Sequence, residues 1–395
     1  MLPSFLAASA ALLSLTSFVH ASPQFQATTS SVRASTTATR VSSASTVSEA
    51  AAATGTTACN NSPLLCNRNY NNITHMGAHD SAFLRDSSTD FSTAGNQFYN
   101  ATVALSAGIR FLQAQVHNSS GTLELCHTTC ELLDGGSLLA FLTPIKTWMD
   151  NNPNEVVTLL LVNSDTESAA AFGSVFASSG ISTYGYTPTS TTGPIATWPT
   201  LQTLITAKTR LMAFVTNIDY DSSYPYLMPE FNYIFESAFG VTSASNFTCD
   251  LDRPSGLTSS ESAISAGYMG LLNHFLDDTL LGITYPDIDA IATTNSASTN
   301  TTGTLGTQGT LCQTQWGNKP TFMLVDFWNV GPSVETADIL NGINGQTTGR
   351  TAVSTAQLTT TTSSGMRAAG RDASGWLKAV ALAMGVVALG NFVWL

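Results

Sequence analysis

The chain has 395 residues, of which 43% are hydrophobic and only 10% are charged. This composition excludes a wholly disordered chain, and the lack of a short repeat excludes collagen-like and coiled-coil rods. The formal net charge is −12 with only 14 Lys and Arg, so a nucleic-acid partner, whose backbone needs clustered cations, is not expected.

The first 57 residues carry an export signal and a polar arm. Residues 1–21 contain an apolar run from Phe5 to Val19, followed by Val19-His20-Ala21 as a cleavage site, the order typical of a secretory signal peptide. Residues 22–57 are rich in Ser and Thr and have almost no large apolar side chains. Such a segment cannot bury a core, so we expect a disordered, O-glycosylated arm.

Residues 58–345 alternate between short apolar runs and helical patterns, as expected of one folded domain. The predicted strands are Ile73–Ala78, Ile109–Val116, Val156–Val162, Leu211–Thr216, Tyr233–Glu236, Gly270–Phe275 and Thr321–Phe327. The predicted helices are Ser137–Met149, Trp198–Lys208 and Glu335–Ile343. Strand–helix alternation over this length predicts a parallel sheet, most economically an α/β fold of the (β/α) TIM-barrel type.

Six cysteines in an exported chain favour disulfides over a zinc site, because no Cys-x-x-Cys pair is present. Six cysteines allow about 15 pairings, and proximity alone suggests Cys59–Cys66, Cys126–Cys130 and Cys249–Cys312. Candidate N-glycosylation sites, each the first residue of Asn-x-Ser/Thr, are Asn60, Asn72, Asn100, Asn118, Asn246 and Asn300.

The last 50 residues predict a stalk and a lipid anchor. Residues 346–365 are again rich in Ser and Thr, and residues 366–395 form a polar spacer followed by an apolar tail. Small residues, spacer and tail in this order indicate a GPI-anchor signal with attachment at Ser363. A tail anchor and a simply secreted chain are the alternatives. We therefore expect a cell-surface chain at the plasma membrane or wall, and its oligomeric state stays open.

Four polar side chains stand where predicted strands end. His79 and Asp80 follow the first strand, His127 follows a short extended run, and Asp326 follows the last strand. Catalytic groups of such barrels lie at the carboxyl ends of the strands. Two histidines suit general acid–base catalysis, and a nearby carboxylate can orient an imidazole. The alternative for each histidine is a partly buried residue with a purely structural role.

The core resembles the phosphatidylinositol-specific phospholipase C-like phosphodiesterases, whose fold is a distorted TIM barrel. The motifs that carry the resemblance are Gly77-Ala78-His79-Asp80-Ser81, Gly108-Ile109-Arg110-Phe111-Leu112, Leu125-Cys126-His127, the stretch from Trp148 to Val157, and Leu324-Val325-Asp326-Phe327. Their order spans nearly all of the core. Cys126 and Cys130 around His127, together with the stretch Tyr224–Pro229, resemble a secreted branch found on fungal surfaces.

This resemblance implies that His79 is the general base and His127 the general acid, with Asp80 and Asp326 as their carboxylate partners. It also implies a phospholipid or related phosphodiester substrate. In the bacterial enzymes the inositol 2-hydroxyl attacks its own phosphodiester without a metal, and releases diacylglycerol and a cyclic inositol phosphate. An internal nucleophile is already positioned, so little further entropy is lost on attack.

The second strand departs from the family pattern. Gln113 and Gln115 stand where the bacterial enzymes have an Asp and a phosphate-contacting Arg, and where metal-dependent relatives have acidic ligands. Gln is uncharged, so we expect neither a cofactor nor a metal ion. The candidate substrate contacts are Gln113, Gln115, Arg110 and His274. Arg110, near the start of its strand, could instead pair with a carboxylate at the base of the barrel.

Three functions are weighed. The first is a metal-independent phosphodiesterase, which accounts for both histidines and their carboxylates. The second is a catalytically impaired surface barrel that binds glycan or lipid headgroups, which accounts for Gln113 and Gln115. The third is a glycosidase, for which Asp80 and Asp326 would have to serve as two carboxylates about 5–10 Å apart. The order of the motifs favours the first.

Overall fold

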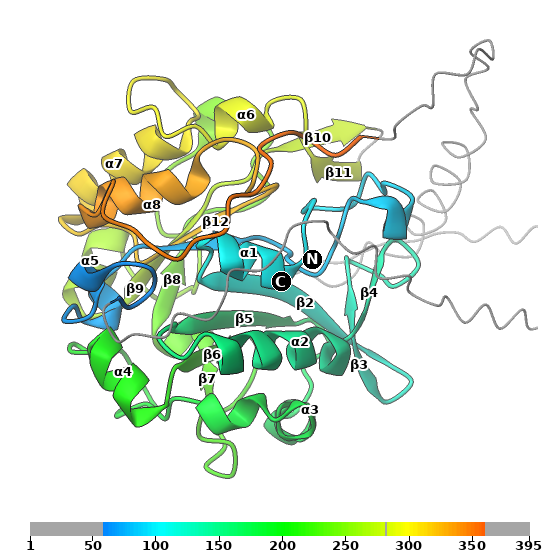
Figure 1. Ribbon diagram of the computed structural model, residues 1–395, viewed down its shortest axis with the longest axis vertical. Coiled ribbons are helices and arrows are strands. Elements are labelled where there is room, and N and C mark those ends of the chain that lie inside the picture. The colour runs from blue at the N-terminus through cyan, green and yellow to red at the C-terminus, as the bar shows by residue number, and fades with distance from the viewer. Residues whose placement is uncertain (1–57, 281–282, 360–395) are drawn as a thin grey trace, which may run out of the picture. The chain divides into compact units, whose positions relative to one another are not determined.

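The computed structural model describes residues 58–280 and 283–359, and the predicted signal peptide, arm and anchor segment with Ser363 lie outside these residues. Eight parallel strands form one curled sheet in the order β7-β6-β5-β2-β1-β12-β9-β8 (Figure 1). These strands are β1 (His75–Ala78), β2 (Phe111–Ser119), β5 (Val157–Asn163), β6 (Leu211–Val215), β7 (Leu227–Pro229), β8 (Ile234–Glu236), β9 (Met269–Asn273) and β12 (Phe322–Val325).

The strands follow one another around the sheet in chain order, as in a TIM-type barrel. Within the described residues no ladder joins β7 to β8, so the sheet is a barrel left open between these two strands. The predicted fold class is therefore confirmed, and every predicted strand has its counterpart. The sequence did not predict β7, which has only three residues and includes Pro229.

Four further strands lie outside the barrel ladder. β3 (Thr122–Cys126) and β4 (Asp134–Ser137) extend β2 as antiparallel partners. β10 (Asp277–Leu280) and β11 (Ile283–Pro286) form a separate antiparallel hairpin. The hairpin begins two residues after Phe275, at the carboxyl end of β9, so it belongs to the same end of the barrel as the predicted catalytic residues.

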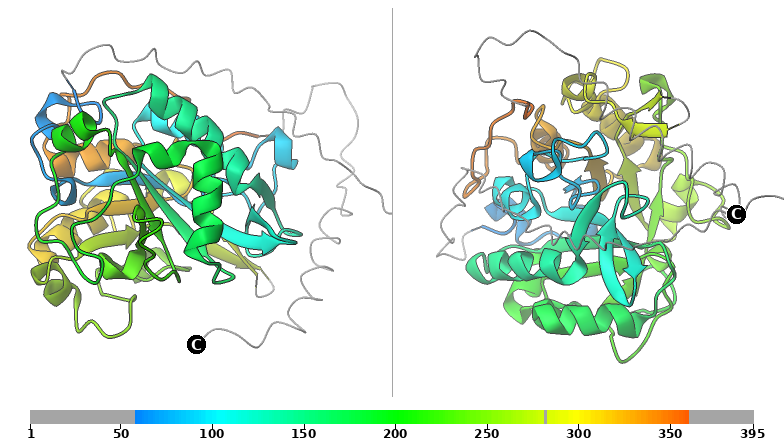
Figure 2. Two further views of the ribbon diagram at one scale, coloured as in Figure 1. Left: turned by 90° about the horizontal axis from the view of Figure 1, so that it is seen from below. Right: turned by 90° about the vertical axis from the view of Figure 1, so that its right-hand side faces the viewer.

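Helices cover the outer face of the sheet (Figures 1 and 2). They are α1 (Ala101–Ala107), α2 (Leu138–Asn151), α3 (Ala169–Ser179), α4 (Leu201–Ala207), α5 (Ser260–Ser265), α6 (Ile291–Thr294), α7 (Leu305–Trp316) and α8 (Ser333–Asn341). In α2 the Ser137 side chain accepts a hydrogen bond from the Ala140 amide and so caps the first turn. The helix ends at Asn151, two residues beyond the predicted end at Met149 and two residues before Pro153. No helix of the described residues is long and apolar enough to cross a bilayer.

Along the barrel strands, successive side chains lie alternately in two buried clusters. Phe111, Leu160, Phe214 and Phe322 lie in the cluster that fills the barrel, whereas their strand neighbours face the helices. Aromatic rings therefore occupy the interior, and polar groups reach it only at its ends. Gly77 on β1 makes this packing possible, because an added Cβ would lie 2.5 Å from Phe111 Cδ1 and 2.7 Å from Leu324 Cδ2.

The packed chain continues beyond the boundary predicted at Gly345. Arg350 pairs with Asp338 through both terminal guanidinium nitrogens, at 2.6 and 2.8 Å. The Thr351 amide donates to the Ser106 carbonyl at 2.8 Å, and Val353 packs against the core. Residues 346–359 are thus part of the folded domain rather than of a free stalk, because these contacts hold them against the barrel.

The three expected disulfides, Cys59–Cys66, Cys126–Cys130 and Cys249–Cys312, are present. Five of the six sequon asparagines are exposed. Asn60 is only 4% exposed, and its Oδ1 accepts from the Val156 amide at 2.7 Å. The prediction of a glycan at Asn60 is therefore wrong, because the folded chain leaves no room around its amide.

Candidate active site

Asp80 is the centre of the candidate site at the carboxyl end of β1. Its carboxylate is fully buried, and Oδ2 lies 3.6 Å from His79 Nε2 and 3.6 Å from His127 Nε2. One oxygen therefore faces both imidazoles, which keep 16% and 15% side-chain exposure. The structure thus brings His79, Asp80 and His127 together, as the strand-end argument predicts.

The Asp80 backbone and carboxylate are fixed by the two glutamines of β2. The Asp80 amide donates to Gln113 Oε1 at 2.6 Å, and Gln115 Nε2 donates to Asp80 Oδ2 at 2.8 Å. Asp80 has φ of 46°, in the left-handed region that Asp tolerates better than most residues. These contacts hold a strained backbone at the site.

Asp326 completes the surroundings of His79 from the end of β12. Its Oδ1 lies 2.8 Å from His79 Nδ1 and accepts from Asn96 Nδ2 at 3.1 Å. A carboxylate at Nδ1 favours the proton on that nitrogen, so Nε2 is the one left free in neutral His79. The next residue, Phe327, has φ of 42°, which is rare for a bulky side chain.

The charges around His79 favour its protonated form. Burial alone lowers the pKa of His79, but the carboxylates of Asp80, Asp326 and Asp277 outweigh it and raise the pKa to about 9. Asp277, the first residue of β10, is half-buried, and burial together with Asp326 and Asp80 raises its pKa to about 7, although His79 acts in the opposite direction. No sequence motif indicates Asp277, because its place near His79 depends on how the hairpin folds.

A tight turn positions His127 at the end of β3 rather than at a barrel strand. The Cys126–Cys130 disulfide closes the turn, and the His127 amide donates to the Leu133 carbonyl at 3.0 Å. The Thr128 amide donates to Gln115 Oε1 at 3.1 Å. Gln115 therefore links the turn to Asp80, because its Oε1 accepts from Thr128 and its Nε2 donates to Asp80.

Aromatic rings contact the two imidazoles in different ways. The Phe275 ring stacks on His79 with 3.7 Å between centroids and 4° between planes. Phe83 meets His127 edge-on, at 5.1 Å and 76°. Sequence reasoning missed Phe275 and Asn96, since no pattern indicates which loop residues face an imidazole.

Gln113 and Gln115 make hydrogen bonds within the site. Gln113 Oε1 is bound by Asp80, and both polar groups of Gln115 are engaged within the site. These contacts position Asp80 and the His127 turn. That the two residues also contact the substrate stays a prediction.

Arg110 and His274 are wrongly predicted as substrate contacts. Arg110 is 4% exposed and pairs with Glu155 at 2.8 and 2.5 Å, at the start of β2 and so at the opposite end of the barrel. This is the structural alternative that the sequence left open. His274 is fully buried, with Nδ1 bound to Gln308 Oε1 and Nε2 2.9 Å from the Thr294 carbonyl. Neither side chain has a polar atom free for a ligand.

The chemistry available here is proton transfer between two imidazoles that share a carboxylate. Asp80 and Asp326 are 0% and 1% exposed, so they cannot act as the two open carboxylates of a glycosidase. Within the described residues no group of three His, Cys, Asp or Glu side chains is arranged to hold a metal ion. The arrangement fits a pair of general acid–base groups.

Comparison with known proteins identifies the family of the chain. The family model described as PI-PLC X 1 matches residues 65–341. The PI-PLC X domain-containing protein 1 of Arthroderma benhamiae is 38% identical over 287 residues, which cover 72% of this chain and 90% of that protein. An uncharacterized secreted protein of the same fungus is 34% identical over 302 residues, which cover 74% of this chain and 66% of that protein.

Solved structures include a similar chain as well. The phosphatidylinositol-specific phospholipase C from Listeria monocytogenes has 15% sequence identity and a TM-score of 0.47, and the match covers 71% of this chain and 96% of that one. The family model extends over most of the barrel, from before β1 to the end of α8. This chain therefore belongs to the PI-PLC X family.

Proposed function

We propose that the chain is a phosphoric diester hydrolase of the phospholipase C type, which cleaves an inositol phospholipid or a related phosphodiester by metal-independent acid–base catalysis. The observation that carries the proposal is the position of Asp80 Oδ2, 3.6 Å from Nε2 of both His79 and His127. Two imidazoles held on one carboxylate can exchange protons with the same bound phosphodiester.

His79 is the general base in this proposal. Asp326 holds Nδ1, and Nε2 of the neutral ring takes the proton from the attacking hydroxyl, which then forms a new bond to phosphorus. Because the pKa of His79 is about 9, only about 1% of the free protein has a neutral His79 at pH 7. We therefore expect kcat/KM to rise with pH between neutrality and pH 9.

His127 is the general acid. As the bond between phosphorus and the departing lipid oxygen breaks, His127 Nε2 gives its proton to that oxygen, and diacylglycerol leaves as a neutral alcohol. Attack by a neighbouring hydroxyl of the headgroup leaves a cyclic phosphate. The Cys126–Cys130 turn and Gln115 support this role, since both hold His127 beside Asp80.

A cell-surface barrel that binds a headgroup without cleaving it is the second candidate. The observation that favours it is the uncharged pair Gln113 and Gln115 on β2, whose amides are already engaged at Asp80. A cation beside the developing charge of a phosphorane stabilises it by several kcal/mol. An enzyme without that cation would be slow, or would depend on the two imidazoles for positive charge.

We also propose that the chain is exported and held at the cell surface by a GPI anchor at Ser363. The apolar segment in residues 1–21 and the tail in residues 366–395 support this. The secreted relative supports export. Exposed sequons at Asn72, Asn100, Asn118, Asn246 and Asn300 are compatible with glycosylation.

The test is phosphorus NMR of the full secreted chain with phosphatidylinositol vesicles, with and without EDTA. We expect a cyclic inositol phosphate in both samples and none with His79→Ala. His117→Ala is the matched control, because His117 lies 3.4 Å from Asp165 and is outside the site. Turnover that EDTA abolishes would contradict the metal-independent mechanism. No turnover of phosphatidylinositol, glycerophosphodiesters or lysolipids would favour a barrel that binds a headgroup without cleaving it.

A further inference from the structure

The carboxyl end of β9 carries a phenyl ring that lies flat on the proposed base. Phe275 is 5% exposed, and its ring is parallel to His79 at 3.7 Å between centroids. We propose that Phe275 is a positioning residue for His79, held in place by a buried network that the Cys249–Cys312 disulfide anchors. The inference rests on the proposed function only for the role of His79 as base, since the contact itself can be measured without a substrate.

Two contacts at right angles fix the His79 ring. The contact with Asp326 lies in the plane of the imidazole, so it fixes the direction of Nδ1 but still allows the ring to tilt about that axis. The stacked Phe275 ring opposes that tilt, because it covers one face of the imidazole. An imidazolium is also attracted to the face of an aromatic ring. Together these contacts aim Nε2 toward Asp80.

The same contact distinguishes the two histidines. Both Nε2 atoms lie 3.6 Å from Asp80 Oδ2, so that carboxylate cannot by itself make one ring a base and the other an acid. His79 has a second carboxylate and a flat phenyl ring, whereas His127 meets the edge-on Phe83. Phe275 therefore contributes to the difference between the two roles.

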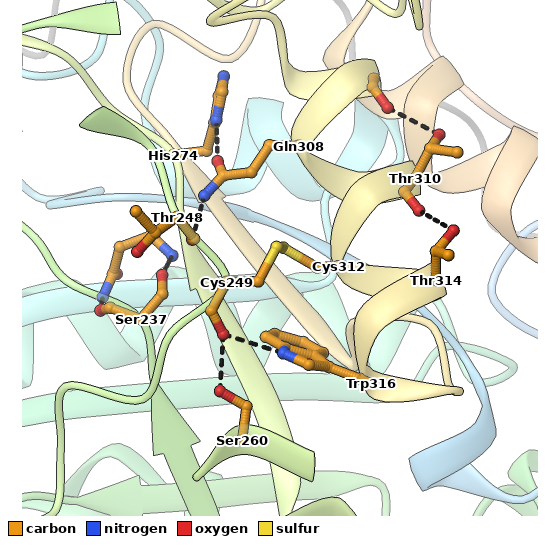
Figure 3. The surroundings of a disulfide bond; sticks show 12 residues. Ser237, Thr248, Cys249, Ser260, His274, Gln308, Thr310, Cys312, Thr314 and Trp316 are labelled. Atoms are coloured by element: carbon orange, nitrogen blue, oxygen red, sulfur yellow. Dashed lines mark hydrogen bonds between the residues drawn. A yellow bond between two sulfur atoms is a disulfide. The ribbon is translucent and has the colours of Figure 1, made fainter. Parts of the chain in front are cut away.

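The residue before Phe275 is anchored through every polar atom of its ring. His274 Nδ1 binds Gln308 Oε1, and Gln308 Nε2 donates to the Thr248 carbonyl at 2.8 Å (Figure 3). The His274 amide donates to the Leu324 carbonyl on β12 at 2.9 Å. Since these groups are buried, a shift of the β9 end would leave polar atoms without partners.

The disulfide ties the two ends of this network together. Cys249 follows Thr248, and Cys312 lies one helical turn after Gln308 on α7 (Figure 3). The Cys249 carbonyl accepts from Trp316 Nε1 at 2.9 Å and from Ser260 Oγ at 2.6 Å. The Thr248–Cys249 segment, α7 and the end of β9 are therefore joined in one buried unit, and Phe275 is part of it.

The test compares Phe275→Leu, Phe275→Tyr and the control Phe176→Leu in the full chain. Phe176 on α3 is also a buried phenyl ring, but its ring neighbour is Tyr226, at 5.8 Å, and it takes no part in the network around Phe275. Proton–carbon NMR of the imidazoles, without substrate, detects the ring current of Phe275 on His79. Kinetics on phosphatidylinositol then separate kcat from KM. In the unaltered protein, a nuclear Overhauser contact between the Phe275 and His79 rings is expected.

With Phe275→Leu we expect the His79 ring protons to move downfield and kcat to fall by about tenfold to a hundredfold, with KM nearly unchanged. Phe275→Tyr keeps both the His79 shifts and kcat near those of the unaltered protein, and Phe176→Leu leaves both unchanged. Unmoved His79 signals, an unchanged kcat or a missing Overhauser contact in the unaltered protein would each overturn the proposal. If the unaltered chain cleaves no phosphodiester, the proposed function fails, and the NMR readouts still decide whether Phe275 positions His79.

Discussion

Asp80 contacts both proposed acid–base residues, because one of its oxygens lies 3.6 Å from each ring. His79 has a second carboxylate partner in Asp326. The effect of each carboxylate on His79 therefore has to be measured separately. Substitution of one carboxylate at a time is needed to separate them.

Asp326→Asn tests the electrostatic origin of the His79 pKa. Asp326 stabilises the imidazolium, so its replacement by a neutral amide should lower the pKa of His79 from about 9 toward its ordinary value near 6.5. An NMR titration of the His79 ring measures this directly. A pKa that stays near 9 in the variant would mean that Asp80 and Asp277 alone hold the proton.

The sequence predicted the place of a site residue only where that residue directly follows a parallel strand. His79, Asp80 and Asp326 follow strands, and the carboxyl ends of parallel strands meet at one end of a barrel. Phe275 and Asp277 follow β9 as well, but a phenyl ring and a lone aspartate carry no motif. The ring contact of Phe275 and the electrostatic interaction of Asp277 with His79 depend on how the chain leaves β9, which no local pattern specifies.

At the scale of elements, the β3 extension matters most for the site. His127 does not come from a barrel strand but from the turn after β3, an antiparallel partner of β2. Three interactions hold this turn. They are the Cys126–Cys130 disulfide, the hydrogen bond from Thr128 to Gln115, and the hydrogen bond from the His127 amide to the Leu133 carbonyl. The proposed general acid, His127, is thus positioned by a disulfide-closed loop as well as by the sheet.

Replacement of Cys126 and Cys130 by Ala should therefore impair catalysis more than folding. Residues 127–130 of this loop are not buried, so we expect a cooperative thermal transition to remain. Freed from its loop, His127 should reach its productive position less often, and kcat should fall by about tenfold to a hundredfold with a smaller change in KM. Steady-state kinetics beside Cys59→Ala/Cys66→Ala separate a local effect from a general loss of stability. An equal loss of kcat in both double variants would contradict a specific role of the Cys126–Cys130 loop in positioning His127.

Two of the elements that sequence reasoning missed, α7 and β7, lack a readable pattern. α7 (Leu305–Trp316) contains Gly, Thr and Gln in place of an apolar stripe, yet it buries Gln308 and Cys312. β7 has three residues and ends at Pro229. Tertiary contacts define both, whereas the predicted β5 and β6 are nearly continuous apolar runs that are buried on both faces.

For the whole molecule, the polar groups of the barrel are divided between its two ends. His79, Asp80 and Asp326 lie at the carboxyl end of the strands, and the buried pair Arg110–Glu155 lies at the other. Aromatic packing fills the space between them. This division explains why an Arg in a family motif at the start of β2 serves the structure rather than the substrate.

The boundary of the folded domain shows the limit of composition as evidence. The Ser- and Thr-rich residues from 346 onward predict a stalk, but Arg350 and Val353 tie this segment to the barrel. These two contacts hold the segment on the barrel although its average composition is that of an unfolded stalk. Truncation at Gly345 would remove both, so the full chain is the sample for each experiment.

The central claim is that His79 and His127 act as base and acid on one phosphodiester, and leaving-group dependence tests it most directly. Turnover of phosphatidylinositol is compared with turnover of a nitrophenyl inositol phosphate, whose leaving group needs no proton.

For His127→Ala we predict a loss of about 10²–10⁴ in kcat on the lipid and a much smaller loss on the nitrophenyl ester. For His79→Ala we predict comparable losses on both substrates, since the nucleophile needs a base in either case. Equal losses for His127→Ala on both substrates would contradict the assignment of His127 as the general acid.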